Sequence, residues 1–201
     1  MSVPFENSET KENLMRAFAG ESQARNRYTM AAAEAKKQNF HVLEQVFTFT
    51  ADQEKEHAEI FYQHLSKMAG KTIHIDADYP VDISNSLEEL LRLAQKHEYE
   101  EHDEIYKSFA QKAKEEGYPE IAASFGLIAC IEKYHGERFG KFAKFMEEGK
   151  LHFCEAEVGW MCLNCGYIAH GSCAPKNCPV CHESQGYFIR LSLAPFENRE
   201  I

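Results

Sequence analysis

The sequence lacks a long apolar run, a surplus of basic residues and a leader-like beginning. No stretch is long and apolar enough to span a bilayer, and the start, MSVPFENSET, has neither the basic nor the apolar region of a signal peptide. The formal net charge of -10 argues against a phosphate backbone as partner, since nucleic-acid binding depends on clusters of Lys and Arg. We therefore expect a cytoplasmic protein with neither a membrane nor a nucleic-acid partner.

Proline and glycine are scarce over most of the chain. Residues 6–148 contain two prolines and few glycines, whereas 152–201 holds six of the seven cysteines and short aromatic and β-branched runs such as GYFIRL. In a cytosolic protein, such cysteines indicate metal or redox chemistry before disulfides. The contrast predicts two domains, 1–150 and 151–201, with Gly149 ending the last helix.

The first domain shows a clear helical period. Apolar residues recur every 3.5–3.6 positions and predict four long amphipathic helices. Tight joints are expected around Gln38-Asn39 and around 117–119, and a non-helical crossover over GKTIHIDADYPVDIS, with Ser84 or Ser86 as N-cap of the third helix. Two helical hairpins joined by one long connection predict a ferritin-like four-helix bundle.

Each predicted helix interrupts its apolar stripe with Glu or His near the middle. The two EKEH and EKYH motifs, 54–57 and 132–135, put two metal-ligand types one turn apart on one helix face. Glu21 precedes the first motif by 33 positions and Glu98 the second by 34, so the second half repeats the first at an offset of 77–78. Buried carboxylates without Lys or Arg partners repel one another unless cations lie between them. This set is typical of di-iron or di-manganese carboxylate proteins, and its O and N ligands suit those metals better than copper.

The acidic run at 98–104 divides by helical phase. Glu98 and Glu101 fall in the apolar phase, and the other acids of the run are expected on a solvated face. Glu101 has Ala24 as its counterpart in the first half, so as a seventh ligand it would make the site asymmetric.

Aromatic and histidine side chains near the motifs leave alternatives open. Tyr28 and Tyr106 either hydrogen-bond a ligand carboxylate from outside the ligand set or simply pack in the core. The remaining histidines do not form a comparable set and are expected to be solvated or capping: His41, His64, His74, His97 and His102.

The C-terminal cysteines form two C-x-x-C pairs. Cys162 with Cys165, and Cys178 with Cys181, predict a tetrahedral site of four thiolates. The spacing does not decide between a zinc ribbon and a rubredoxin-type iron site. The other three cysteines are expected in the core of the last helix (Cys130) or in loops (Cys154 and Cys173).

The whole set resembles the rubrerythrin family over nearly the full chain. The resemblance is carried by Glu21, EKEH, EYEE at 98–101, EKYH, and the rubredoxin-like CLNCGY followed by CPVC. Two features depart from the family pattern: Cys173 lies in a GSCAP loop where a small residue is expected, and Lys96 and His97 replace small residues before Glu98.

The resemblance implies a non-haem di-iron peroxidase of oxidative-stress defence, which reduces hydrogen peroxide to water. It implies an oxygen-bridged di-iron centre in the bundle, and one iron on the four cysteines that relays electrons from an NADH- or NADPH-dependent reductase or a rubredoxin. It implies that Glu54 and Glu132 bridge the two irons and that Glu21 and Glu98 are terminal ligands. It also implies that His135 binds the second iron, and that the first iron is bound by Glu101 in the oxidised centre and by His57 in the reduced centre.

Distance along the last helix predicts an assembly. His135 lies about 13 residues, or roughly 20 Å, before the end of that helix, which separates the two metal sites of one chain. A head-to-tail homodimer, as the family also suggests, would bring them together. The alternatives are a ferroxidase that handles iron as ferritins do, and a non-catalytic scaffold with a zinc ribbon for protein contacts.

Overall fold

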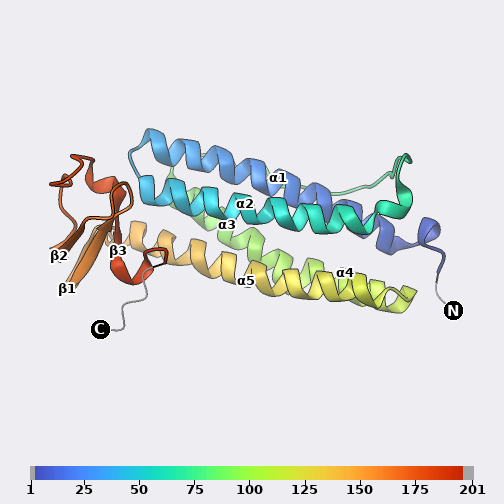
Figure 1. The fold of residues 1–201 in the computed structure, drawn as a ribbon. Coiled ribbons are helices and arrows are strands. Elements are labelled where there is room, and N and C mark those ends of the chain that lie inside the picture. Colours follow the sequence, from blue (N-terminus) through green and yellow to red (C-terminus); the bar gives the residue numbers. More distant parts are fainter. Residues whose placement is uncertain (1–2, 197–201) are drawn as a thin grey trace.

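The computed structural model describes residues 3–196, which form a long helical bundle with a small sheet at one end (Figure 1). The sheet is antiparallel, in the order β2-β1-β3. This architecture confirms the predicted ferritin-like bundle with a small C-terminal metal-binding module. The elements are α1 (Glu9–Lys37), α2 (His41–His64), α3 (Leu87–Glu100), α4 (Tyr106–Glu116), α5 (Pro119–Glu147), β1 (Phe153–Cys162), β2 (Ile168–Cys173) and β3 (Phe188–Arg190).

Local signals set the helix ends as expected. α1 and α2 are joined at Gln38 and Asn39, the latter with φ +60°, and α5 begins with Pro119 at its first turn. Ser86 is the N-cap of α3, because its hydroxyl accepts from the backbone N–H of Glu89. Two antiparallel pairs result, with α1 on α2, and α3 and α4 on α5.

The predicted third helix is interrupted by a π-helical turn, which separates α3 from α4. This turn spans Glu101–Ile105. Glu21 precedes Tyr28 by seven positions, whereas Glu98 precedes Tyr106 by eight. A π turn holds one more residue than an α turn, so it absorbs the extra position and keeps both tyrosines in equivalent places. The predicted third helix is therefore present, but this one turn of it is π-helical and not α-helical.

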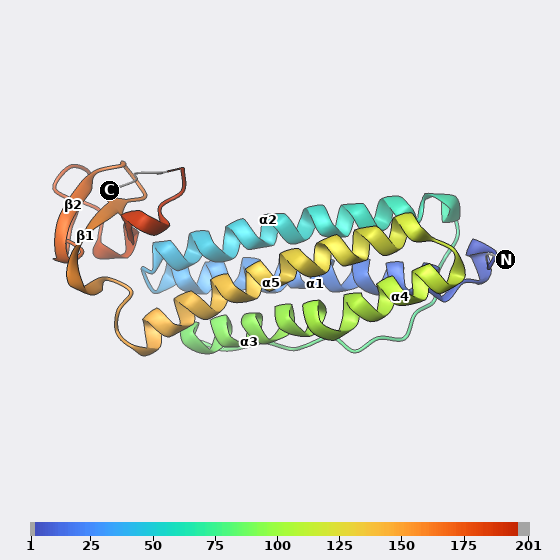
Figure 2. The ribbon, with the colours of Figure 1, turned by 90° about the horizontal axis from the view of Figure 1, so that it is seen from below.

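The crossover runs the length of the bundle as an extended segment beside α3 and α4 (Figure 2). It is held to α1 by polar contacts. The Arg16 guanidinium lies 2.8 Å from the Asp76 carboxylate, and the backbone carbonyl of Arg16 accepts a hydrogen bond from the Tyr79 hydroxyl. Farther along, Gln38 Nε2 donates to the backbone carbonyl of Asn85. The connection thus closes the bundle on one side without adding a helix.

Two apolar clusters fill the bundle and leave a polar layer between them. One cluster lies toward the sheet and includes Phe47, Leu91 and Phe139, while the other includes Phe61 and Phe125. Six buried Glu and His residues lie between these clusters: Glu21, Glu54, His57, Glu98, Glu132 and His135. Apolar side chains therefore exclude water from the polar layer on both sides.

The C-terminal module packs against the end of the bundle where α1 meets α2. Leu151, Met161 and Leu191 belong to the same core cluster as the bundle helices. The ring of His41 stacks on Tyr187 with centroids 3.8 Å apart. His41 is only 9% exposed, so the expectation that it is solvated or capping was wrong.

The three cysteines outside the C-x-x-C pairs are placed differently from their predictions. Cys130 is exposed, because Ala129 and Glu132 take the inward positions of α5 at this level and the helical rotation turns Cys130 outward. Cys154 lies in β1 and Cys173 in β2, so neither is a loop thiol.

Candidate metal centres

Six polar side chains converge in the middle of the bundle. They come from four helices, and each is at most 5% exposed. Within the chain that the structure describes, none of them forms an ion pair with a lysine or arginine. The six are Glu21 of α1, Glu54 and His57 of α2, Glu98 of α3, and Glu132 and His135 of α5.

These residues form two groups that share Glu54 and Glu132. Each shared carboxylate turns one oxygen toward each group. His57 Nδ1 lies 3.0 Å from Glu54 Oε2 and 3.0 Å from Glu132 Oε1. His135 Nδ1 lies 2.9 Å from Glu54 Oε1 and 2.8 Å from Glu132 Oε2. The geometry is that of two neighbouring cation sites with two bridging carboxylates, completed by Glu21 on one side and Glu98 on the other.

Buried atoms without hydrogen-bond partners test whether metals fit. Among the described residues, Glu21 Oε2, Glu98 Oε2, both oxygens of Glu132 and His135 Nδ1 have none. Such atoms destabilise a fold unless a cation binds them. Six hard or borderline donors arranged in two groups suit a pair of iron or manganese ions. The residues therefore fit the di-metal centre that their spacing predicts.

Two tyrosines hold the outer oxygens of the unshared carboxylates. The Tyr28 hydroxyl donates to Glu98 Oε1, and the Tyr106 hydroxyl donates to Glu21 Oε1. Each bond joins helices from different hairpins and leaves the other oxygen, Oε2, pointing at the centre without a partner. Both tyrosines are also packed in the core, so the two alternatives left open by the sequence hold together.

His135 is oriented by Gln53, which the sequence analysis missed. His135 Nε2 lies 3.1 Å from Gln53 Oε1, and Arg138 Nη1 donates to the same oxygen at 3.0 Å and to Thr50 Oγ1 at 2.8 Å. The amide oxygen only accepts, so it selects the His135 tautomer that has a proton on Nε2 and a lone pair on Nδ1. The sequence hints at these two residues only by their positions, because Gln53 adjoins Glu54 and Arg138 lies one turn after His135.

We expect Gln53→Ala to weaken metal binding on the His135 side by about ten- to a hundredfold, the usual effect of removing such a support. The ring would lose the contact that sets its tautomer. Calorimetric titration of metal-free bundle with Co²⁺ measures the affinity. Gln63→Ala, on an exposed position of the same helix, is the control and should bind as the parent does. Equal affinities for the parent and Gln53→Ala would contradict the role.

Glu101 lies outside both groups. Its side chain is half-buried at the start of the π turn and lines a cavity of about 510 Å³, together with Arg27, Tyr79 and His97. Burial, and then the nearby charge of Glu98, raise the pKa of the Glu101 carboxyl well above its usual range. The structure thus places a carboxylate beside the centre, and its role as a ligand stays a prediction.

The metal-free centre holds extra protons near neutral pH. Burial and the charge of Glu54 raise the pKa of Glu98 to about 8. For His57 and His135, burial lowers the pKa, but the adjoining carboxylates of Glu132 and Glu54 outweigh it and raise the values to about 9 and about 12. Metal ions must displace these protons to reach their ligands, so binding should release protons.

We expect the metal-free protein to lose stability between pH 7 and pH 9.5. In the unfolded chain Glu98 and His57 have released their protons below this window, whereas the folded chain still binds them and releases them within it. The native state then binds more protons than the unfolded state, so the free energy of unfolding falls as pH rises. Thermal melts followed by circular dichroism measure this. Glu98→Gln should have the shallower slope, and an equal slope would contradict the assignment.

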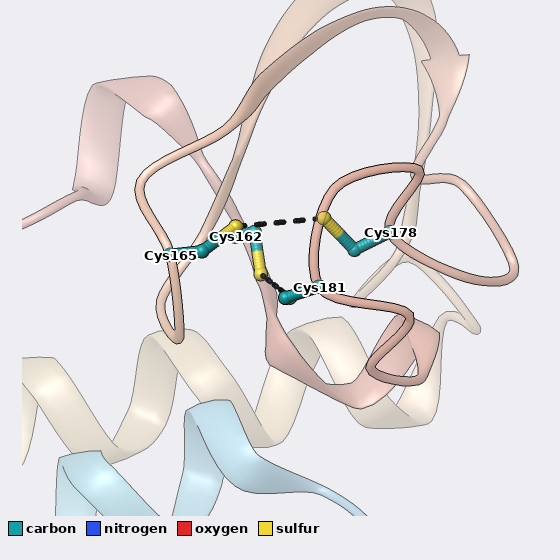
Figure 3. A group of neighbouring side chains, drawn as sticks. All are labelled: Cys162, Cys165, Cys178 and Cys181. Atoms are coloured by element: carbon teal, nitrogen blue, oxygen red, sulfur yellow. Dashed lines mark hydrogen bonds between the residues drawn. The ribbon is translucent and has the colours of Figure 1, made fainter.

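Four cysteine thiols form a second candidate site in the C-terminal module (Figure 3). The distance between the sulfur atoms is 3.7 Å for Cys162 and Cys181, and it is 3.6 Å for Cys165 and Cys178. Each C-x-x-C turn is followed by a residue with positive φ, Gly166 at +78° in one and a histidine at +64° in the other. Two matching turns thus present four thiolates to one point, as a tetrahedral metal requires.

Both parts of the chain match known families. The rubrerythrin family matches residues 12–143, and the rubredoxin-like domain of rubrerythrin matches residues 160–189. The chain belongs to the rubrerythrin family. Rubrerythrin of Clostridium perfringens is 44% identical over 182 residues, covering 90% of this chain and 93% of its own. Rubrerythrin of Nitratidesulfovibrio vulgaris is 41% identical, covering 92% and 96%.

Solved structures agree with this membership. Fully reduced, all-ferrous nigerythrin superposes with a TM-score of 0.62 at 27% identity, covering 94% of this chain and 88% of that one. A bacterioferritin of Mycobacterium tuberculosis, at 16% identity and a TM-score of 0.62, shares the fold, covering 74% and 90%. The rubrerythrin thus combines carboxylate and histidine groups for a di-iron centre with a rubredoxin-like site of four cysteines. None of its described helices could cross a membrane.

Proposed function

We propose that this rubrerythrin is a non-haem di-iron peroxidase that reduces hydrogen peroxide to water. Each turnover takes one peroxide, two electrons and two protons and yields two waters. The observation that carries the proposal is the sharing of Glu54 and Glu132 between two groups of ligands, in a chain that also has a four-thiolate site. A pair of ferrous ions, when bound there, supplies the two electrons that cleavage of one O–O bond requires.

The chain's own residues would divide the work as follows. Glu54 and Glu132 keep two cations at a short separation, because each has one oxygen for each side. Glu21 and Glu98 each add one oxygen to one side, and their tyrosine partners keep them from rotating away. The two apolar clusters on either side of the centre along the bundle exclude water, which strengthens every charge interaction in the centre.

His57 and Glu101 would alternate on the first ion. A carboxylate neutralises ferric charge better, and a neutral imidazole suits ferrous iron. Glu101 begins the π turn, where the backbone departs from regular helix, and its side chain faces a cavity rather than packed core. This position offers the room that a moving ligand needs, whereas its counterpart Ala24 is buried.

The four cysteines would hold an iron that supplies one-electron chemistry, and the acceptor would be the di-metal centre of a partner chain. The module adjoins His41 at the start of α2, and Glu54 lies 13 positions further, roughly 20 Å along the helix. A head-to-tail homodimer would shorten this separation. Apolar side chains exposed on α2 and α5 support such an interface: Phe49, Ile60, Leu127 and Tyr134. A reductase that uses NADH or NADPH, or a rubredoxin, would supply the electrons.

Stopped-flow absorbance tests the proposal. Iron-loaded protein, reduced anaerobically, is mixed with hydrogen peroxide or with air-saturated buffer. We expect fast return of the ferric-thiolate colour with peroxide and slow return with dioxygen. If dioxygen and added ferrous iron gave the faster reaction, the centre would be a ferroxidase and the peroxidase proposal would fail.

A further inference from the structure

The crossover inverts the expected burial pattern around Asp82. Val81 and Ile83 are 82% and 90% exposed, whereas the Asp82 side chain between them is 9% exposed. Burying a valine or isoleucine stabilises a fold by about 1.5–3 kcal/mol, whereas burying a carboxylate costs free energy unless it is paired. An extended segment alternates its side chains between two faces, so a shift of one residue would reverse the pattern. The inward position of Asp82 must therefore come from what it binds.

Asp82 binds one side chain from each of two helices. Its Oδ2 accepts from Arg27 Nη1 on α1, and its Oδ1 lies 3.3 Å from His97 Nε2 on α3. Both partners are held in turn: Arg27 Nε donates to Gln23 Oε1 at 2.6 Å, and His97 Nδ1 lies 3.1 Å from Glu100 Oε2. The three side chains at the middle of this network are at most 13% exposed. One carboxylate thus ties α1 to α3 through the crossover.

Both partners of Asp82 adjoin residues of the metal centre. Arg27 precedes Tyr28, and His97 precedes Glu98. Inside the bundle, the Tyr28 hydroxyl donates to Glu98. α1 packs mainly on α2, and α3 mainly on α5, so few other contacts join α1 to α3. Asp82 therefore joins the two helices on the outside at the level where Tyr28 and Glu98 join them inside.

We propose that Asp82 is a positioning residue for the metal centre. By binding both helices, it holds α1 and α3 at the separation at which Glu98 points toward the shared carboxylates. Asp82 itself touches no metal ligand and acts through its two partners. The inference rests on the proposed role of Glu98 as a ligand. It assigns a function to His97, a residue that departs from the family pattern.

The test compares Asp82→Asn with Asp76→Asn. Asp76 lies on the same crossover and pairs with Arg16, but its side chain is 92% exposed, so its variant changes the same charge without loosening the helices. Full-length protein with iron in its four-cysteine site and no metal in its bundle is titrated anaerobically with Co²⁺ in a calorimeter. We expect two Co²⁺ to bind the parent. The Co²⁺ on the side of Glu98 and His135, called here the second ion, should bind Asp82→Asn about ten- to a hundredfold more weakly.

The remaining results separate positioning from general stability. The Co²⁺ on the His57 side should bind Asp82→Asn as in the parent, and Asp76→Asn should bind both ions within about twofold of the parent. A loss of stability alone would weaken both ions equally and would overturn the inference, as would equal weakening by Asp76→Asn. If Asp82→Asn does not fold, Arg27→Lys should bind the second ion more tightly than Arg27→Gln. A parent that binds fewer than two ions would overturn the proposed function as well.

Discussion

Glu132→Gln should abolish the paired metal site and reduce peroxide turnover by about a thousandfold. Glu132 turns one oxygen to each group, so the amide removes a negative ligand from both ions at once. A bound metal ion contributes several kcal/mol of transition-state stabilisation, and about 1.4 kcal/mol corresponds to a factor of ten. Metal analysis of the bundle and the initial rate of peroxide consumption measure the two effects.

The matched control for this variant is Glu120→Gln. Glu120 lies on the same helix, is exposed, and belongs to neither group. Its variant should retain two ions and the turnover of the parent. Circular dichroism should show both variants helical, and the ferric-thiolate colour should remain in both. If Glu132→Gln bound two ions and turned over normally, the bridging role of that carboxylate would be wrong.

Cys178→Ser should separate the two halves of the reaction. Without the fourth thiolate the module cannot hold a rubredoxin-type iron, because a tetrahedral site needs all four cysteines. Steady-state turnover with reduced rubredoxin as donor should fall by at least about a hundredfold. A single turnover of chemically reduced protein with peroxide should persist, since the ligands of the bundle are untouched.

Cys173→Ser provides the control for this experiment. Cys173 is an exposed thiol of β2 that lies outside the group of four, so its variant should keep both the colour and the steady-state rate. If Cys178→Ser lost its colour yet kept full turnover with rubredoxin, electrons would reach the bundle without the cysteine iron. The relay in the proposed function would then fail, while the peroxidase activity would stand.

Spacing in the sequence predicted much of the candidate centre. Two residues at i and i+3 lie on one face of any α-helix, so the Glu and His of each motif, at 54–57 and at 132–135, necessarily share one helix face. Four thiolates in two C-x-x-C turns were equally evident, because each turn is local. Errors arose where the surroundings decide. Cys130 is apolar enough for a core, yet its outward place on α5 follows from which of its neighbours, Ala129 and Glu132, point inward.

The sequence by itself determined the kinds of ligand, their helices and the ferritin-like order of the elements, because helical period and short motifs depend on neighbours along the chain. Only the tertiary structure decided which oxygen of Glu54 and Glu132 faces each group, that each tyrosine serves the other hairpin, that Gln53 contacts His135, and that Asp82 binds both α1 and α3. These contacts join residues up to 85 positions apart. They depend on the rotation and axial offset of packed helices, which no local pattern records.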